Sequence, residues 1–222
     1  MLRAAGRELL DGAVESISEL EENLADIERS NRWLGGYSAL ENAVDALRPQ
    51  TILDVGCGSG DAAKFLARKA RASRKDLRIT CLDVNADVLA IAQKRHGDPN
   101  VRFVRGDGVS LPFEDASFDV AMCNLTLHHC DPAEAVALLR ELRRVARLSP
   151  VVTDLRRSRV GWAGAVLLVS IFTRNRMTRH DAPLSVLRAY TPDEALDLAR
   201  QAGWKNPRVR RTRFFRMVLS DG

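Results

Sequence analysis

A carboxylate and three glycines at alternate positions mark the strongest candidate binding site in this sequence. Residues 51–60 begin as a short apolar strand, reach Asp54 and continue through Gly56, Gly58 and Gly60 into a helix-forming stretch. Glycine lets the backbone approach a ligand closely, and the N-terminus of a helix offers free N–H groups. The pattern therefore predicts a ligand pocket at a strand–turn–helix junction.

Asp61 narrows the kind of ligand. A dinucleotide-binding turn reads G-x-G-x-x-G, which counted from Gly56 requires a glycine at position 61. An aspartate there is unfavourable beside a pyrophosphate, because it brings two anions together. The run D-x-G-x-G-x-G instead favours a cofactor with a cationic ammonium group and little negative charge.

Two motifs in the chain carry a family resemblance. Residues 53–60, Leu-Asp-Val-Gly-Cys-Gly-Ser-Gly, resemble the first motif of the class I S-adenosylmethionine-dependent methyltransferases. Residues 111–120, Leu-Pro-Phe-Glu-Asp-Ala-Ser-Phe-Asp-Val, resemble a signature of small-molecule methyltransferases, including those of ubiquinone and menaquinone biosynthesis. The resemblance covers roughly residues 31–219 and implies S-adenosyl-L-methionine as the cofactor.

Polar residues at successive strand ends complete the predicted cofactor site, because ligands of open α/β sheets bind beyond the carboxyl ends of the strands. Asp83 is expected to accept the ribose hydroxyl protons, with a helix N-cap as the alternative, and Val84 to pack on adenine. Asp107 is expected to accept from the adenine amino group. Arg32 and Tyr37 are candidates for the methionine carboxylate, or else surface linker residues. The predicted cofactor-binding set is Asp54, Gly56, Cys57, Gly58, Gly60, Asp83, Val84, Asp107, Gly108, Asn124 and Arg32.

Leu127-His128-His129 follows the strand that ends at Asn124. A hydroxyl acceptor requires a base to remove its proton, and histidine is the usual choice near neutral pH. The resemblance to methyltransferases with a similar L-H-H motif implies His128 as the base, with Asp154 after the next strand orienting its imidazole. The alternative is that both histidines cap the strand. The four cysteines lack zinc-ligand spacing, so no metal is expected.

The segment of residues 155–190 is expected to be an insertion over the acceptor site. Residues 161–172 are apolar on every side and flanked by arginines, yet shorter than the ~20 residues that span a bilayer. A buried helix, an interfacial helix or a lid fits this pattern, and a lid predicts a lipophilic acceptor such as a phenol, a quinone precursor or a polyketide. His180 and Asp181 are candidates for touching the acceptor as well.

O-methylation of such an acceptor is the main functional prediction. The tetrad Asn124-Leu-Thr-Leu lacks the prolines of the Asn/Asp-Pro-Pro-aromatic tetrad of nucleic-acid amino-methyltransferases, so a nucleic-acid acceptor is not expected. C- or N-methylation of a small molecule and a non-catalytic cofactor-binding protein remain alternatives. Residues 140–216 carry 18 basic and six acidic residues, so a lipid-surface or nucleic-acid binder is a further alternative.

Alternating strands and helices position these residues. Strands are expected at 51–55, 78–82, 101–104, 118–123 and 150–153, with helices near 61–71, 86–96 and 132–146 between them. After a helix from a capping box at Thr191, residues 208–213 and 215–219 are expected to pair antiparallel. The predicted fold is α/β, Rossmann-like and doubly wound, with a mostly parallel seven-stranded sheet closed by a C-terminal antiparallel hairpin.

The N-terminal part is expected to be helical. Leu10, Ile17 and Leu24, with Ala13, Leu20 and Ile27 between them, predict an amphipathic helix over 7–30, and a second helix is expected near 38–47. These segments form a predicted helical cap, 1–48, before a methyltransferase domain, 49–222. With 222 residues, 45% hydrophobic content, a net charge of +5 and no apolar leader, the chain is expected to be cytoplasmic, without stable membrane insertion, and a monomer or weak homodimer.

Overall fold

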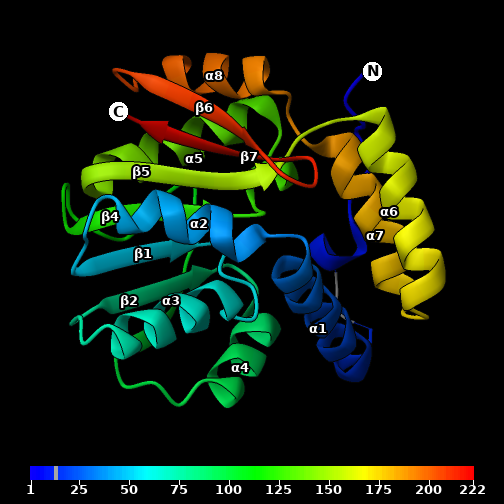
Figure 1. Ribbon diagram of the computed structural model, residues 1–222, viewed down its shortest axis with the longest axis horizontal. Coiled ribbons are helices and arrows are strands. Elements are labelled where there is room, and N and C mark those ends of the chain that lie inside the picture. The colour runs from blue at the N-terminus through cyan, green and yellow to red at the C-terminus, as the bar shows by residue number, and fades with distance from the viewer. Residues whose placement is uncertain (13–14) are drawn as a thin grey trace.

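The computed structural model describes residues 1–12 and 15–222, and the strands of this part form one seven-stranded sheet (Figure 1). Its order is β3-β2-β1-β4-β5-β7-β6. β1 to β5 run parallel, whereas β7 is antiparallel to both β5 and β6. The predicted fold class is confirmed. The strands are β1 (Thr51–Val55), β2 (Arg78–Asp83), β3 (Val101–Arg105), β4 (Phe118–Asn124), β5 (Ala146–Leu155), β6 (Pro207–Thr212) and β7 (Arg216–Asp221).

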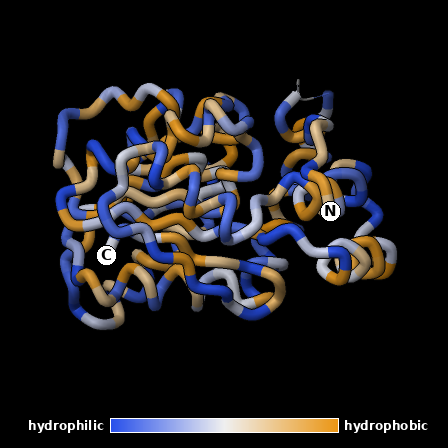
Figure 2. The backbone as a smooth tube through the Cα atoms, turned by 90° about the horizontal axis from the view of Figure 1, so that it is seen from above, coloured by the Kyte–Doolittle hydropathy of each residue, from blue (hydrophilic) through white to orange (hydrophobic). Residues whose placement is uncertain are grey.

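Helices cover both faces of the sheet. On one face, α5 (Pro132–Val145) and α8 (Pro192–Gln201) pack buried leucines and alanines against the sheet. On the other face, α2 (Gly36–Asp45) and α3 (Asp61–Ala72) do the same. Figure 2 shows hydrophobic stretches concentrated in the strands between these layers. This two-faced burial explains why the central strands are apolar throughout.

Local sequence signals set the helix starts. Asp131 and Glu134 form a capping box before α5, with Pro132 at its first position, and Thr191 and Glu194 do the same for α8. Asn85 caps α4 (Ala86–Arg95) by accepting from the N–H groups of residues 87 and 88.

The N-terminal helix differs from the prediction. Residues 9–11 form a 3₁₀ turn, η1 (Leu9–Asp11), and α1 (Ile17–Trp33) begins only after Ser16, whose side chain accepts from the N–H of Glu19. The single helix predicted over 7–30 is therefore wrong at its start, and it ends three residues later than expected. Ala13, one of the residues that suggested it, lies outside the described residues.

Three helices stand beyond the carboxyl ends of the parallel strands: α1, α6 (Arg159–Phe172) and α7 (Arg176–Arg188) (Figure 1). Leu20 and Leu24 of α1 pack with Met177 of α7 and with Val88 and Ile91 of α4. α6 packs on α7, but most of its large side chains are exposed, so it is not a buried core helix. These helices cover the edge of the sheet at which the parallel strands end in polar residues.

Candidate active site

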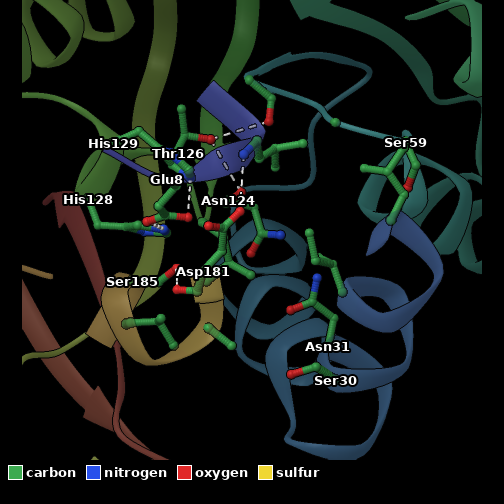
Figure 3. Close-up of a pocket in the computed structure, with 18 of the residues that line it drawn as sticks. Glu8, Ser30, Asn31, Ser59, Asn124, Thr126, His128, His129, Asp181 and Ser185 are labelled. Atoms are coloured by element: carbon green, nitrogen blue, oxygen red, sulfur yellow. Dashed lines mark hydrogen bonds and ion pairs between the residues drawn. The ribbon is translucent and has the colours of Figure 1, made fainter. Parts of the chain in front are cut away.

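A cavity of about 910 Å³ lies between the carboxyl edge of the sheet and the roof of α1, α6 and α7. The glycine-rich turn of residues 55–59 and the ends of β2 and β4 line one side, and apolar residues of α6 line another. Figure 3 shows Glu8, His128 and His129 grouped at one side, Ser59, Ser30 and Asn31 at the other, and Asn124 and Thr126 between them. One cavity thus joins most of the predicted cofactor residues to His128, the predicted base.

The turn after β1 is held in shape from both sides. Gly56 and Cys57 donate N–H bonds to the carbonyl of Leu82, at 2.8 and 3.1 Å. Gly56 has φ +68°, and a Cβ there would lie 2.4 Å from Cγ2 of Thr126. Gly58 also has a positive φ, +54°, but a Cβ there would meet nothing within 4 Å. Gly56 is therefore required by packing, whereas Gly58 leaves open space on the cavity side.

Asp54 is a buried carboxylate without a partner. Neither of its oxygens has a hydrogen-bond partner within the described residues. Burial, with the negative charges of Asp61 and Asp83, raises the pKa of the Asp54 carboxyl well above its usual value. A bound ammonium group would supply the missing positive charge, so this residue fits the amino end of S-adenosylmethionine.

Asp83 links the turn to the end of β2. Its Oδ2 accepts from the N–H of Gly58 at 2.9 Å and its Oδ1 from the N–H of Asn85 at 3.0 Å. Val84 beside it is exposed and lines the cavity. Asp107 and Gly108, which follow β3, line the cavity too. Gly60, the third glycine of the motif, does not line the cavity, because it starts α3 against His96 and Phe103.

Arg32 is a correction to the predicted cofactor set. Its side chain is 62% exposed, pairs with Glu28 at 3.0 Å and does not line the cavity. Neighbouring residues of a helix point about 100° apart, so Asn31 faces inward while Arg32 faces solvent. The buried cation on this wall is Arg216 at the start of β7, which donates from Nη2 to Oδ1 of Asn31 at 3.0 Å. Burial lowers the pKa of Arg216 to about 10.

Tyr37 does not reach the cavity either, but it fixes Asp61. Its hydroxyl donates to Oδ2 of Asp61 at 2.7 Å, and the amide of Asn31 donates to the same oxygen at 3.2 Å. Asp61 lines the cavity at the first turn of α3. The acid that disfavours a dinucleotide is thus held in place by two donors.

His128 and Asp154 form a buried pair. The 3₁₀ turn η2 (Leu127–His129) after β4 brings the imidazole to the end of β5, where Nδ1 lies 2.7 Å from Oδ1 of Asp154. The backbone N–H of His128 donates to Oδ2 of the same carboxylate at 3.0 Å. Burial alone raises the pKa of the Asp154 carboxyl, but the charge and hydrogen bond of His128 outweigh it and hold that pKa below its usual value. An ionised Asp154 keeps the Nδ1 proton and leaves Nε2 free to accept another.

Glu8 is the site residue that sequence reasoning missed. Its Oε1 lies 3.6 Å from Nε2 of His128 and its Oε2 lies 3.8 Å from Nε2 of His129. Burial raises the pKa of the Glu8 carboxyl to about 7, although nearby His129 lowers it. No spacing rule links residue 8 to residue 128, so the sequence carries no signal for this contact.

The N-terminal segment that carries Glu8 is anchored by Asp181 and Arg188 of α7. Both oxygens of Asp181 accept from the N–H groups of Leu9 and Leu10, at 2.8 and 3.0 Å. Arg188 donates from Nη1 to the carbonyl of Gly6 and from Nε to the carbonyl of His128, the latter at 3.0 Å, so it ties this segment to η2. Asp181 lines the cavity, but His180 does not and its side chain is 49% exposed. The tail of the insertion therefore positions the site, and only Asp181 of the two candidates can meet a ligand.

Among residues 1–12 and 15–222, Glu8, His128 and His129 are the one group of ligand-type side chains close enough to hold a metal ion. Their ligand atoms lie within 4.8 Å of one another. Nε of Arg188 lies 4.0 Å from Oε1 of Glu8, so a fixed positive charge already faces this carboxylate. The absence of a metal from the reaction stays a prediction.

Comparisons with known proteins agree with this arrangement. Residues 52–148 match a family model described as "Methyltransferase domain". A probable phthiotriol/phenolphthiotriol dimycocerosates methyltransferase of Mycobacterium ulcerans is 40% identical over 101 residues, covering 46% of this chain and 37% of that protein. A fatty-acid O-methyltransferase of Mycolicibacterium smegmatis is 40% identical over 96 residues, covering 43% and 33%. The chain thus spans about a third of the length of these curated relatives.

A solved structure extends the likeness to nearly the whole chain. Human N-acetylserotonin methyltransferase in complex with S-adenosylmethionine superposes with a TM-score of 0.70 at 17% identity, covering 97% of this chain and 62% of that one. At this sequence identity the superposition is evidence for a shared fold alone. Residues 52–148 therefore match the methyltransferase family, and the chain has the Rossmann-like fold of S-adenosylmethionine-dependent methyltransferases.

The open space at Gly58 gives a test of the cofactor wall. We expect Gly58→Ala to lower the affinity for S-adenosylmethionine at least tenfold, because the new methyl group occupies the cavity side of the turn. Gly203→Ala is the matched control, since Gly203 has φ +85°, also has nothing within 4 Å and does not line the cavity. Both variants are expected to lose about 1–2 kcal/mol of unfolding free energy. Calorimetric titration with the cofactor checks this, and equal affinities in the two variants would contradict it.

Proposed function

We propose that this protein methylates an oxygen atom of a small lipophilic acceptor, with S-adenosylmethionine as methyl donor and His128 as base. The observation that carries the proposal is that His128 lines the same cavity as Asp54 and Gly58, while its Nδ1 lies 2.7 Å from the buried carboxylate of Asp154. A base and a cofactor cradle in one cavity are what proton removal and methyl transfer require.

The cofactor residues divide the cavity by charge. Asp54 holds the ammonium group, Arg216 in place of Arg32 binds the methionine carboxylate, and Asp83 accepts from the ribose hydroxyls. Val84 packs on adenine and Asp107 accepts from its amino group. The bound cofactor supplies an electrophilic methyl group on a positively charged sulfur.

His128, oriented by Asp154, removes the hydroxyl proton of the acceptor. Asp154 holds Nδ1–H of the imidazole, so Nε2 accepts the proton as the acceptor oxygen forms its new bond to carbon. The imidazolium that results is stabilised by the ionised Asp154. Glu8, a second carboxylate 3.6 Å from Nε2, lies where it can take up or share that proton.

The lipophilic character of the acceptor rests on the roof of the cavity. Ala165, Leu168, Val169 and Phe172 of α6 line the cavity and bring no charge to it. Apolar walls exclude water, which favours a reaction in which charge is lost from sulfur. The names of the two mycobacterial relatives, which refer to lipid methylation, support the same class of acceptor. A cytoplasmic location and a monomeric or weakly dimeric state are part of the proposal.

A homologous series of alkylphenols tests this acceptor class. Each buried methylene contributes ~0.8 kcal/mol, so we expect kcat/KM to rise by about fourfold or less per methylene until the cavity is full. Transfer from labelled S-adenosylmethionine measures the rates, with catechol and tyramine as polar controls. A preference for these polar acceptors, or transfer to amines only, would contradict the proposal.

A further inference from the structure

The outer face of α6 is apolar and uncovered. Val160, Leu167 and Ile171 share this face, and their exposed fractions are 69%, 60% and 63%. The opposite face, with Leu168 and Val169, lines the cavity. A helix that is hydrophobic all round is normally buried, so we expect another surface to bind the outer face of α6.

Positive charge frames this face. Arg159 begins α6 and Arg174 follows its end, and α6 itself contains no acidic residue. Both arginines are exposed, as is Arg179 on the adjoining α7, and none of the three has an acidic partner in the part of the chain that the structure describes. The surface that complements α6 is therefore apolar in its interior and anionic at its boundary.

The cavity opens beside the same helix. Phe172 at the end of α6 lines the cavity and is also exposed. Trp33 and Phe214 likewise line the cavity and are exposed. These three aromatic side chains come from α1, α6 and the turn between β6 and β7. The apolar outer face of α6 thus adjoins an aromatic border of the cavity.

We propose that α6 docks on an anionic lipid surface, and that a lipophilic acceptor passes from the lipid into the cavity beside Phe172. Val160, Leu167 and Ile171 enter the boundary between headgroups and acyl chains, while Arg159 and Arg174 bind lipid phosphates. Docking is interfacial, because within residues 1–12 and 15–222 every helix is too short or too polar to cross a bilayer. The route of the acceptor rests on the proposed function, whereas docking does not.

Vesicle flotation tests the docking. The full chain is mixed with vesicles of phosphatidylcholine alone or with 30% phosphatidylglycerol. We expect binding to the anionic vesicles that weakens as salt is raised. Leu167→Glu/Ile171→Glu is expected to weaken binding at least tenfold. The control Leu148→Glu changes a residue that is 47% exposed at the start of β5, at the other end of the strand from Asp154, and is expected to bind like the unaltered protein.

Two double variants that each reverse the charge of two arginines provide a second comparison. We expect Arg159→Glu/Arg174→Glu to abolish the preference for anionic vesicles, whereas Arg68→Glu/Arg140→Glu, on exposed positions of α3 and α5, preserves it. Equal loss in both pairs would mean that net charge alone drives binding and would overturn the assignment to α6. Binding to neither vesicle type would overturn the proposal as well.

The state of assembly separates lipid from a second copy of the chain. If light scattering finds a dimer that Leu167→Glu/Ile171→Glu dissociates, and flotation finds no binding, the face is covered by another copy and the lipid proposal fails. Methyl transfer to a short water-soluble phenol is expected to be unchanged in the α6 double variant, because neither residue lines the cavity. Docking without any methyl transfer would contradict the proposed function and leave the docking intact.

Discussion

His128→Ala is expected to lower methyl transfer to a hydroxyl acceptor by about 10²–10⁴-fold, the usual contribution of a positioned acid or base. The imidazole is the group that can accept the acceptor's proton while Asp154, 2.7 Å from Nδ1, fixes its orientation. The affinity for S-adenosylmethionine is expected to change less than threefold, because His128 is not among the residues assigned to the cofactor. Single-turnover rates and cofactor titration measure the two effects separately.

His180→Ala is the matched control for that experiment. His180 also has its Nδ1 beside a carboxylate, Oδ1 of Asp181 at 2.8 Å, but its side chain is half exposed and lies outside the cavity. We expect near-normal turnover in this variant. Near-normal turnover in His128→Ala, or equal losses in both variants, would rule out His128 as the base.

Asp54→Asn is expected to make the protein more stable without cofactor and weaker in binding it. The carboxyl of Asp54 is buried beside Asp61 and Asp83, which disfavours its ionised form, and neither oxygen has a partner among the described residues. Removing the charge is expected to add about 1–2 kcal/mol to the unfolding free energy at pH 7.5, or about 2–8 °C in Tm. Loss of a charged partner for the ammonium group is expected to weaken binding about 10–100-fold.

The pH dependence of this effect has a definite sign. The folded state raises the pKa of Asp54 above its unfolded value near 3.8, so the folded protein holds this proton more tightly. The stability that Asp54 contributes is fully present below pH 3.8 and is lost as the pH rises through the folded pKa. The advantage of Asp54→Asn is therefore expected to grow from acidic toward neutral pH in thermal denaturation.

Asp119→Asn is the control with the opposite sign. Oδ2 of Asp119 accepts from the N–H groups of Gln50 and Thr51, and Oδ1 accepts from Nε of Arg147 at 3.0 Å. Burial alone raises the pKa of Asp119, but these donors hold it below its usual value. We expect this variant to lose about 1–3 kcal/mol with unchanged cofactor affinity. If Asp54→Asn is destabilised in the same way, Asp54 has a structural partner and its assigned role is wrong.

The strand ends of the sheet could be predicted from sequence because the signals there are local. A strand, a glycine turn and a helix follow one another within residues 51–72, and an acid directly after a strand in a parallel sheet must lie at the carboxyl edge. The His128–Asp154 contact was inferred through family resemblance, and the 2.7 Å distance between their side chains agrees with it.

The roof could not be predicted in the same way. Glu8 meets His128, and Arg216 meets Asn31 across 185 residues of sequence, only because α1, α7 and the sheet edge converge. The sequence favours Arg32 because it is a cation close to the cofactor motif in the chain. On α1, however, Arg32 and the inward-facing Asn31 are successive residues that point about 100° apart. Contacts that depend on how helices pack leave no fixed spacing in the sequence.

The most direct test of the central claim is the position of the transferred methyl group. The protein is incubated with S-adenosylmethionine carrying a ¹³C-labelled methyl group and with the best alkylphenol of the series, and the product is examined by NMR. The account predicts a labelled methyl group bonded to the acceptor oxygen, formed by the unaltered protein and nearly lost in His128→Ala. A label on carbon or nitrogen, or equal O-methylation by the two proteins, would contradict it.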